Sequence, residues 1–304
     1  MFLFSAANNA FSQNNDQNDR IYSFSFGPLA GFVYGQSFEY VYKLHKSSDL
    51  LSELIWDIKP IFYLGSQFDF GRADLTSGAG VFASLQFKAG FPAITGVMED
   101  RDWTSNHSGQ LTHYSEHTNK TAEFFWLDFC AGTSIPIANQ FYIKPLLAFS
   151  WMHFSFIGSD GFGTYEFENW EYHPFSGEVI TYMQDWLLAS LGVSFGAYIG
   201  PLLQLEVSFK YTPLTYCAAL DHHITTKMFF RDFSRWGHYI EPSGSLSLKL
   251  NKADLTLEFS YREIGRTRGE SFSSSDNNNY FPSANEAGAA LSVIDTRLVF
   301  KIIF

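Results

Sequence analysis

The feature that most limits how this chain can fold is an alternation of apolar and polar residues along many of its segments. In residues 253–262 (ADLTLEFSYR) every second side chain is apolar and those between are polar, and residues 203–211 (LQLEVSFKY) repeat the pattern. Successive side chains of a β-strand point to opposite faces, so these segments are strands with one apolar and one polar face. No apolar run approaches the roughly 18 residues that a transmembrane helix requires. The chain is therefore predicted to be all-β.

The polar segments between these strands alternate in length. Short turns are expected near 138–140, 199–202 and 250–253, and long polar segments occupy 97–121, 159–179, 223–237 and 269–288. Outer-membrane barrels have short turns on one side and long loops on the other, whereas a soluble sandwich has no reason to keep this order. Ten strands are expected, at roughly 21–43, 52–70, 79–95, 122–137, 141–158, 180–199, 202–220, 238–250, 254–268 and 289–304. An even number closes an antiparallel barrel without a free edge, as hydrocarbon requires.

The sequence thus predicts a single ten-stranded antiparallel transmembrane β-barrel with long extracellular loops and short periplasmic turns, formed by residues 21–304. Residues 1–20 are expected to be a flexible leader or signal remnant, because their apolar stretch (MFLFSAA) is short and lacks a positive start. A soluble, lipocalin-like barrel or sandwich shows similar alternation and remains an alternative.

Composition narrows the classes of partner. Aromatic residues make up 18% of the 304 residues, which favours strands, and the net charge is -11. Because no basic stripe is present to neutralise phosphates, nucleic acid is not expected as a partner, whereas basic peptides suit an acidic chain. The two cysteines, Cys130 and Cys217, fit no metal-site spacing, and a disulfide between them is not indicated.

Two distant pairs of ionisable residues carry the chemical signal: Asp100 and Asp102 in MEDRDW, and Asp221 and His223 in LDHH. Side chains two residues apart share one face of a strand. Both pairs lie where a predicted strand meets a long loop, on the same side of the barrel, so they are expected to meet at its mouth. Two carboxylates facing a His–carboxylate pair can hold and deprotonate a water molecule without a Ser or Cys nucleophile.

The strand that leads to the second pair presents a difficulty. Strict alternation from Lys210 places Asp221 and His223 on the face opposite Lys210. Pro213 cannot donate a ladder hydrogen bond, so a bulge there is expected to reset the register. The alternative is that the strand has already left the bilayer, where facing matters less.

The sequence also offers the residues for two other site chemistries. His222 beside His223, with the aspartates, suggests zinc, but no HExxH or cysteine spacing supports it and no metal is predicted. Ser115 and His117 offer a nucleophile and a base, although their i, i+2 spacing in a loop is poor evidence for a catalytic triad.

The residues around both pairs carry a family resemblance. GVMEDRDW (96–103) resembles the Gly-x-Met-x-Asp-x-Asp-Trp stretch of the omptins, outer-membrane proteases of Gram-negative bacteria, and KYTPLTYCAALDHH (210–223) resembles the family's segment that ends in Asp-Glu-His. The first match continues through Ser105, Asn106, Gly109, Thr112, Ser115 and His117.

The resemblance implies a ten-stranded barrel with a groove at its outer mouth, where water held between an Asp–Asp couple and an Asp–His dyad hydrolyses a peptide bond. Asp100 and Asp102 match the couple, and Asp221 and His223 match the dyad. His223 would act as general base and Asp221 would orient its imidazole. Two aspartates this close repel each other, so one of them is expected to keep a proton.

Two departures from the family pattern bear on specificity and activation. Omptins that prefer basic residues carry an extra acid two positions before the dyad aspartate, where this chain has Ala219, and Glu39 is the candidate to supply that charge instead. Omptins also bind lipopolysaccharide phosphate through arginines on the outer wall. His153 and Asp185 occupy the matching positions and cannot reproduce bidentate phosphate binding, so lipopolysaccharide activation is not predicted.

The sequence therefore predicts an outer-membrane endopeptidase of a Gram-negative-type bacterium, monomeric and without a cofactor, that acts on peptide or protein substrates. The alternative is a non-catalytic barrel, an adhesin or a pore, that uses its acidic rim for binding.

Overall fold

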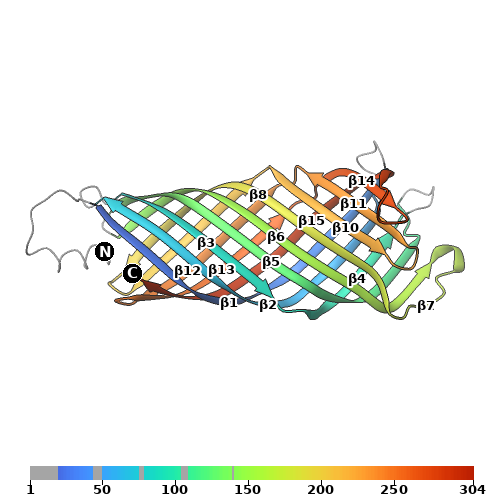
Figure 1. Cartoon of the computed structure of the whole chain (residues 1–304), viewed down its shortest axis with the longest axis horizontal. Helices are drawn as coiled ribbons and strands as arrows, with labels where there is room; N and C mark the ends of the chain where they lie inside the picture. Colours follow the sequence, from blue (N-terminus) through green and yellow to red (C-terminus); the bar gives the residue numbers. More distant parts are fainter. Residues whose placement is uncertain (1–19, 44–49, 75–78, 104–108, 139) are drawn as a thin grey trace, which may run out of the picture.

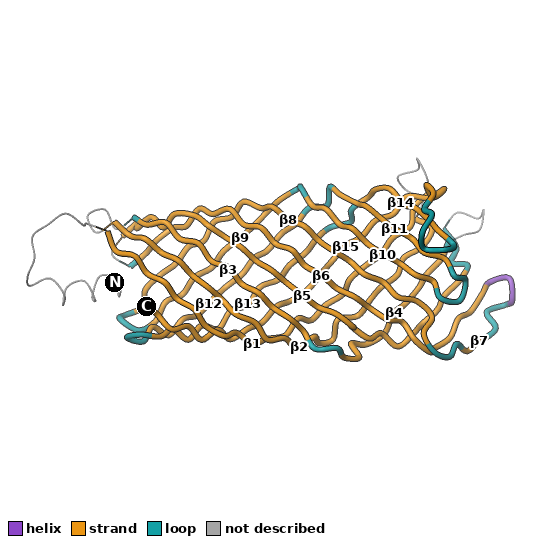
Figure 2. Tube along the Cα trace, viewed as in Figure 1, coloured by secondary structure: helices purple, strands orange, loops and turns teal. Residues whose placement is uncertain are grey.

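The computed structural model describes residues 20–43, 50–74, 79–103, 109–138 and 140–304. Within these ranges the chain is almost entirely strand and forms one long, tilted antiparallel barrel (Figures 1 and 2). The strands are β1 (Arg20–Lys43), β2 (Leu50–Asp74), β3 (Gly80–Gly90), β4 (Ala93–Asp102), β5 (His113–Ala138), β6 (Phe141–Tyr165), β7 (His173–Pro174), β8 (Glu178–Ile199), β9 (Leu203–Thr212), β10 (Thr215–His223), β11 (Met228–Arg235), β12 (Tyr239–Lys249), β13 (Ala253–Ile264), β14 (Arg268–Ser274) and β15 (Phe281–Ile303). A single turn of 3-10 helix, η1 (Glu166–Glu168), precedes β7.

The predicted ring of ten strands is confirmed for the described part of the chain. β3 and β4 are two halves of one long strand, as are β9 and β10, β11 and β12, and β13 and β14, and β7 is a short addition to the end of β6. Counting each divided strand once and omitting β7 leaves ten around the ring. β15 pairs with β1 on one side and with β13 and β14 on the other, which closes the barrel.

At the end of the barrel away from the chain termini, the strands extend well beyond their predicted ends. The segments expected to be long loops are largely strand: β4 runs to Asp102, β5 begins at His113, and β11, β14 and β15 occupy most of the last two segments. This correction has a physical cause. Beyond the bilayer both faces of a strand meet water or polar groups, so the alternation that reveals a strand in lipid disappears from the sequence.

The outer face near the termini is apolar. On β1 the outward residues Tyr22, Phe24 and Phe26 are exposed, as are Leu298 and Phe300 on the neighbouring β15. In the described ranges, no helix has the length and apolar character needed to cross a bilayer. The predicted leader, residues 1–20, falls almost wholly outside the described residues, and Arg20 is the first residue of β1.

The barrel interior is filled by large aromatic side chains and paired charges. Lys88 is fully buried and contacts Asp295 at 2.7 Å, and Arg262 forms two hydrogen bonds with Asp128. The aromatic residues of this core are fully buried: Trp56, Tyr63, Phe124, Trp126, Phe154, Phe156, Tyr182, Trp186 and Tyr239. A cavity of about 1,040 Å³ lies near the termini and a cleft lies at the opposite end, and the two share no lining residue.

The bulge expected at Pro213 is present. β9 ends at Thr212 and β10 begins at Thr215, and the two residues between them are exposed. Tyr211 pairs with Leu191 and Thr215 with Leu188, so four steps along this strand match three along β8. The extra residue exchanges the two faces of the strand, and Asp221 and His223 therefore point to the same side as Lys210.

Candidate active site

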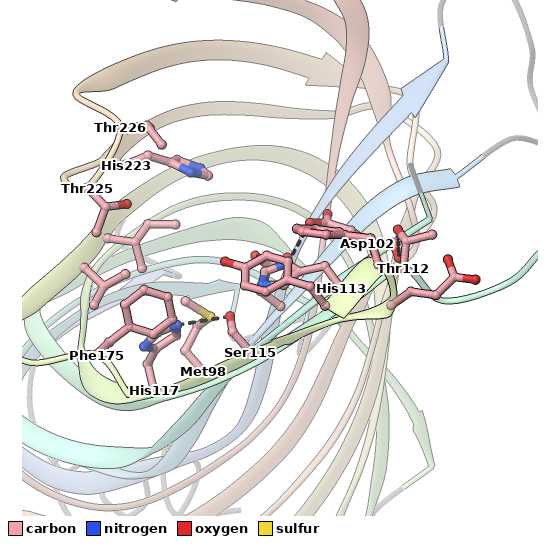
Figure 3. A pocket seen from close by; sticks show the side chains of 16 residues that line it. Met98, Asp102, Thr112, His113, Ser115, His117, Phe175, His223, Thr225 and Thr226 are labelled. Atoms are coloured by element: carbon pink, nitrogen blue, oxygen red, sulfur yellow. Dashed lines mark hydrogen bonds and ion pairs between the residues drawn. The ribbon is translucent and has the colours of Figure 1, made fainter. Parts of the chain in front are cut away.

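A cleft of about 530 Å³ opens at the end of the barrel away from the termini (Figure 3). β4 and β5 form one wall, and the last residue of β10 with the turn after it forms the opposite wall. The polar residues that line it include Asp100, Asp102, His113, Ser115, His117, Glu166 and His223, and the apolar ones include Met98, Phe167, Phe175, Val179 and Ile180.

Strand register explains how one wall of the cleft is assembled. β4 and β5 are antiparallel, and their pairing places Asp102 opposite His113, Asp100 opposite Ser115 and Met98 opposite His117. Because side chains two apart share a face, three successive pairs point into the cleft together. The Asp100–Asp102 couple thus lies beside imidazoles that the same hairpin provides.

The aspartate couple is held by specific contacts. His113 Nδ1 lies 2.9 Å from Asp102 Oδ2 and 3.9 Å from Asp100 Oδ2. The Ser52 hydroxyl donates to Asp100 Oδ1 at 3.3 Å, and the His113 ring stacks on Tyr165 with centroids 4.5 Å apart. These contacts fix the orientation of both carboxylates.

The dyad forms the facing side of the cleft. His223 Nε2 lies 2.6 Å from Asp221 Oδ2, and the Asp221 carboxylate is buried behind the imidazole. In Figure 3 His223 lies near Thr225 and Thr226, across the cleft from His113 and Asp102. The structure therefore brings the two distant sequence pairs to one cavity, with His223, Asp100 and Asp102 lining it and Asp221 behind them.

The ionisation of both sides is strongly shifted. Burial, reinforced by the neighbouring Asp102 charge, raises the pKa of Asp100 to about 7. Burial opposes the charged form of His223, but the charge and hydrogen bond of Asp221, together with the charges of Asp100 and Asp102, outweigh it and raise the pKa of His223 to about 9. A carboxyl and an imidazole that exchange protons within this range are suited to acid–base chemistry.

Ser115 and His117 are also brought together. The His117 Nδ1 donates to the main-chain carbonyl of Asp160 at 2.5 Å, which leaves Nε2 to accept from the Ser115 hydroxyl at 3.0 Å. Burial lowers the pKa of His117, so the imidazole stays neutral. Both residues are only 3% exposed, however, and lie deeper than the aspartate couple.

A group of buried acids lies behind the dyad. Glu39 on β1 is buried, and burial together with Asp221 and Asp232 raises its pKa well above the ordinary value. Asp232 on β11 is likewise buried, and its position is directly opposite Ala219 in the strand pairing. Each of these three carboxylates has one buried oxygen without a hydrogen-bond partner among the described residues.

The remaining predicted positions lie away from the cleft. His153 contacts Asp185 at 3.0 Å and Glu123 at 3.3 Å. His222 stacks on Phe229 with ring centroids 3.9 Å apart, and it is not among the residues that line the cleft. Cys130 and Cys217 are free thiols.

Sequence reasoning missed three residues of this region: His113, Tyr165 and Asp232. His113 was detectable from the sequence. It is two residues before Ser115 and four before His117, so all three share one face of a strand, and it faces Asp102 once 96–117 is folded as a hairpin. Asp232 carried a weaker signal, as a single acid among the phenylalanines of KMFFRDFSRW. Tyr165 carried none, since its role depends on the pairing of β5 with β6.

Comparisons with known proteins agree with this architecture. The sequence model of the Omptin family matches residues 20–303. The crystal structure of the outer membrane protease OmpT from Escherichia coli superposes with a TM-score of 0.74 at 17% identity, covering 96% of this chain and 99% of that one. Among curated proteins, none matches the sequence.

Two other solved structures are far less similar. The translocator domain of the autotransporter NalP from Neisseria meningitidis has a TM-score of 0.32 at 9% identity, covering 98% of this chain and 92% of that one. The toluene transporter TodX from Pseudomonas putida has a TM-score of 0.28 at 7% identity, covering 93% and 90%. The family match spans nearly all of the described residues, and the chain therefore belongs to the omptin family, with its barrel in the outer membrane of a Gram-negative cell.

Proposed function

We propose that this omptin is an endopeptidase that hydrolyses peptide bonds with a water molecule activated between the Asp100–Asp102 couple and the Asp221–His223 dyad. The observation that carries the proposal is that Asp100, Asp102 and His223, from distant parts of the chain, line one cleft. The residues of the site all come from one chain, which suits activity as a monomer.

Each group has a defined part in the proposed reaction. Neutral His223 takes a proton from the water as its oxygen attacks the scissile carbonyl carbon, and later gives that proton to the leaving amine. Asp221, 2.6 Å from His223 Nε2, orients the ring and stabilises its charged form. The aspartate couple, sharing one proton, anchors the water on the other side.

Ser115 and His117 provide a competing nucleophile and base. The His117 imidazole carries its proton on Nδ1, so Nε2 is free to accept the proton of the Ser115 hydroxyl. The burial of both favours the water mechanism, since an attacking hydroxyl must reach the substrate carbonyl. If the water mechanism is correct, Ser115→Ala retains activity and serine-protease inhibitors have no effect. Abolished activity in Ser115→Ala, together with covalent labelling of Ser115, would identify serine as the nucleophile.

The central test is incubation of refolded protein with a peptide library, with cut sites mapped by mass spectrometry. Asp100→Asn, Asp102→Asn and His223→Ala should each lower kcat/KM by about 10²–10⁴-fold, the range of general acid–base catalysis. His222→Ala is the matched control, because this adjacent imidazole stacks on Phe229 and does not line the cleft. Equal losses in all four variants would contradict the proposed roles.

We also propose a preference for substrates with a basic side chain next to the cut bond. Ala219 stands where other omptins carry an acid, and Asp232 lies directly opposite it on the neighbouring strand. Glu39 lies close enough to Asp221 and Asp232 for their charges to raise its pKa. Burial raises the pKa of Glu39 well above its ordinary value and that of Asp232 to about 7, and a Lys or Arg side chain placed beside them would favour their ionised forms.

A charge-relocation experiment tests this preference. Asp232→Ala should reduce cleavage beside Lys or Arg more than cleavage elsewhere, and the double change Ala219→Asp with Asp232→Ala should restore it. If Asp232→Ala lowers cleavage of all peptides equally, Asp232 is structural and does not set specificity.

We propose, finally, that activity does not require lipopolysaccharide. His153 lies between Asp185 and Glu123, an arrangement that offers acid groups rather than an arginine fork to a phosphate. Adding lipopolysaccharide to refolded protein should leave kcat/KM unchanged, and a large stimulation would show that another surface binds it.

A further inference from the structure

We propose that the hairpin between β6 and β8, residues 160–178, is an exosite: a surface outside the cleft that binds a substrate segment carrying basic and apolar side chains. The inference rests on the proposed function, because it names the kind of peptide on which the enzyme would act. In Figures 1 and 2 this hairpin, which contains η1 and β7, projects past the other described strands at the end of the barrel away from the termini.

The hairpin is strongly acidic. Its 160–178 segment contains no Lys or Arg and five acids, which are Asp160, Glu166, Glu168, Glu171 and Glu178. Three of them, Glu166, Glu171 and Glu178, are exposed. His173, the one side chain of this segment that can carry a positive charge, contacts Glu168 at 2.5 Å. Charge complementarity therefore favours a basic partner.

Large aromatic rings are exposed on the same hairpin. Phe167 is 79% exposed and Trp170 is 43% exposed, although burial of such rings is favourable. Exposed aromatic groups rimmed by polar residues are typical of binding surfaces. Phe167 and its neighbour Glu166 also line the cleft, so the exosite and the cleft form one continuous surface.

Main-chain hydrogen bonds hold the hairpin in one conformation. The N–H of Trp170 donates to the carbonyl of Tyr165 at 2.9 Å, that of Asn169 to Glu166 at 3.0 Å, and that of Glu166 to Thr112 at 2.9 Å. Trp170 has a φ of 64°, in the left-handed region that bulky side chains rarely adopt. Strained residues of this kind cluster at functional sites, and a surface fixed in advance loses less entropy when a partner binds.

A row of ring contacts joins the exosite to the aspartate couple. Phe167 packs against Tyr165 with ring centroids 5.4 Å apart, and Tyr165 stacks on His113 with centroids 4.5 Å apart. His113 Nδ1 in turn lies 2.9 Å from Asp102 Oδ2. A peptide bound by the hairpin therefore enters the cleft on the side of the aspartate couple.

The first test measures binding without cleavage. A dye-labelled peptide of alternating lysine and leucine residues is titrated with the refolded His223→Ala protein in detergent, and fluorescence anisotropy gives Kd. Phe167→Ala and Trp170→Asn, added to this background, should each raise Kd roughly five- to tenfold, as expected for an aromatic anchor of an interface. Asparagine is chosen at 170 because it tolerates the left-handed backbone. Phe281→Ala, at another exposed ring of the same end of the barrel, is the matched control and should leave Kd unchanged.

The charge of the hairpin is tested with the same peptide. Glu166→Gln combined with Glu171→Gln should raise Kd and make it less dependent on salt concentration, because fewer charges then attract the lysines. Glu270→Gln, an exposed acid on β14, is the control and should change neither quantity. A peptide of alternating glutamate and leucine should not bind.

The second test compares two cleavable peptides in the protein with His223 intact. One is just long enough to fill the cleft, and the other is the same peptide extended by the lysine–leucine sequence. Trp170→Asn should leave kcat/KM of the short peptide unchanged and lower that of the extended peptide through a higher KM. Retention of the folded form in each variant is checked by circular dichroism and by gel mobility of unheated samples.

The outcomes separate the two proposals. An unchanged Kd in both Phe167→Ala and Trp170→Asn overturns the exosite, whether or not the protein cuts peptides. Binding that depends on the hairpin, in a protein that cuts no peptide, supports the exosite and contradicts the proposed hydrolysis. An equal loss of kcat/KM on the short and extended peptides in Trp170→Asn also overturns the exosite, because the ring would then support only the structure of the cleft.

Discussion

At the scale of single residues, the central result is that two groups facing one cleft both have raised pKa values. The pKa of Asp100 is raised to about 7 and that of His223 to about 9. Between these values the dominant form carries charged Asp100 and charged His223. The proposed reactive form, with a proton on the aspartate couple and neutral His223, holds the same number of protons.

The pH dependence of activity follows from this proton count. We expect kcat/KM to be bell-shaped, rising with an apparent pKa of about 7 and falling with one of about 9, because only the singly protonated pair is reactive. Steady-state kinetics from pH 5 to about 10.5 on one peptide measures both limbs. A pH profile with a single limb, near the ordinary pKa of histidine, would contradict electrostatic coupling between the aspartate couple and the dyad.

Asp100 is also expected to lower stability at neutral and basic pH. In the unfolded chain it ionises near 3.8, whereas in the folded protein ionisation is delayed to about 7 by burial and by Asp102. The folded state therefore loses stability as pH rises from about 4 to 7, and the deficit is constant above that range. Asp100→Asn, which keeps an acceptor for Ser52, should be more stable than wild type at pH 8 and equally stable at pH 3.

Denaturant unfolding at both pH values measures this difference. Glu171→Gln, at an exposed acid of the same rim, is the control and should change stability at neither pH. Equal stability of Asp100→Asn and wild type at pH 8 would show that the carboxyl ionises without cost in the folded protein.

At the scale of elements, the one-residue bulge between β9 and β10 is what turns the dyad inward. Four steps from Tyr211 to Thr215 match three steps on β8, and this exchanges the faces of everything that follows. Deleting Leu214 should restore plain alternation and direct Asp221 and His223 outward.

We expect the Leu214 deletion to abolish peptide hydrolysis while β9 and the membrane part of the barrel still form. Leu214→Ala keeps the chain length and should retain activity, so the pair separates register from side-chain loss. Peptide cleavage is measured beside gel mobility of unheated samples, and normal activity in the deletion would show that the bulge relocates instead of disappearing.

At the scale of the whole molecule, the barrel interior holds many large buried side chains, which argues against the pore alternative. Buried aromatic side chains and the Lys88–Asp295 and Arg262–Asp128 pairs occupy this interior. Purified protein in a planar lipid bilayer is expected to show no steady ion conductance. Stable open channels in wild type would contradict this and favour a pore.

Much of the fold was predictable because lipid imposes a pattern on the sequence. An apolar outside and a polar inside force alternation along each membrane segment, as 253–262 shows, and this revealed the strands and the number in the ring. The extensions of β4, β5 and β11 beyond the bilayer were missed because no solvent contrast marks them there.

For the site, the sequence alone identified the residues that line or support the cleft at Asp100, Asp102, Asp221 and His223, since spacing and flanking residues are local properties. Which way the dyad points was decided by the bulge at 213–214, and the partners His113, Tyr165 and Asp232 were decided by strand register. Register joins residues that are distant in the chain, and its energy is shared over entire ladders of hydrogen bonds. No short stretch of sequence carries that information, so only the closed barrel could show it.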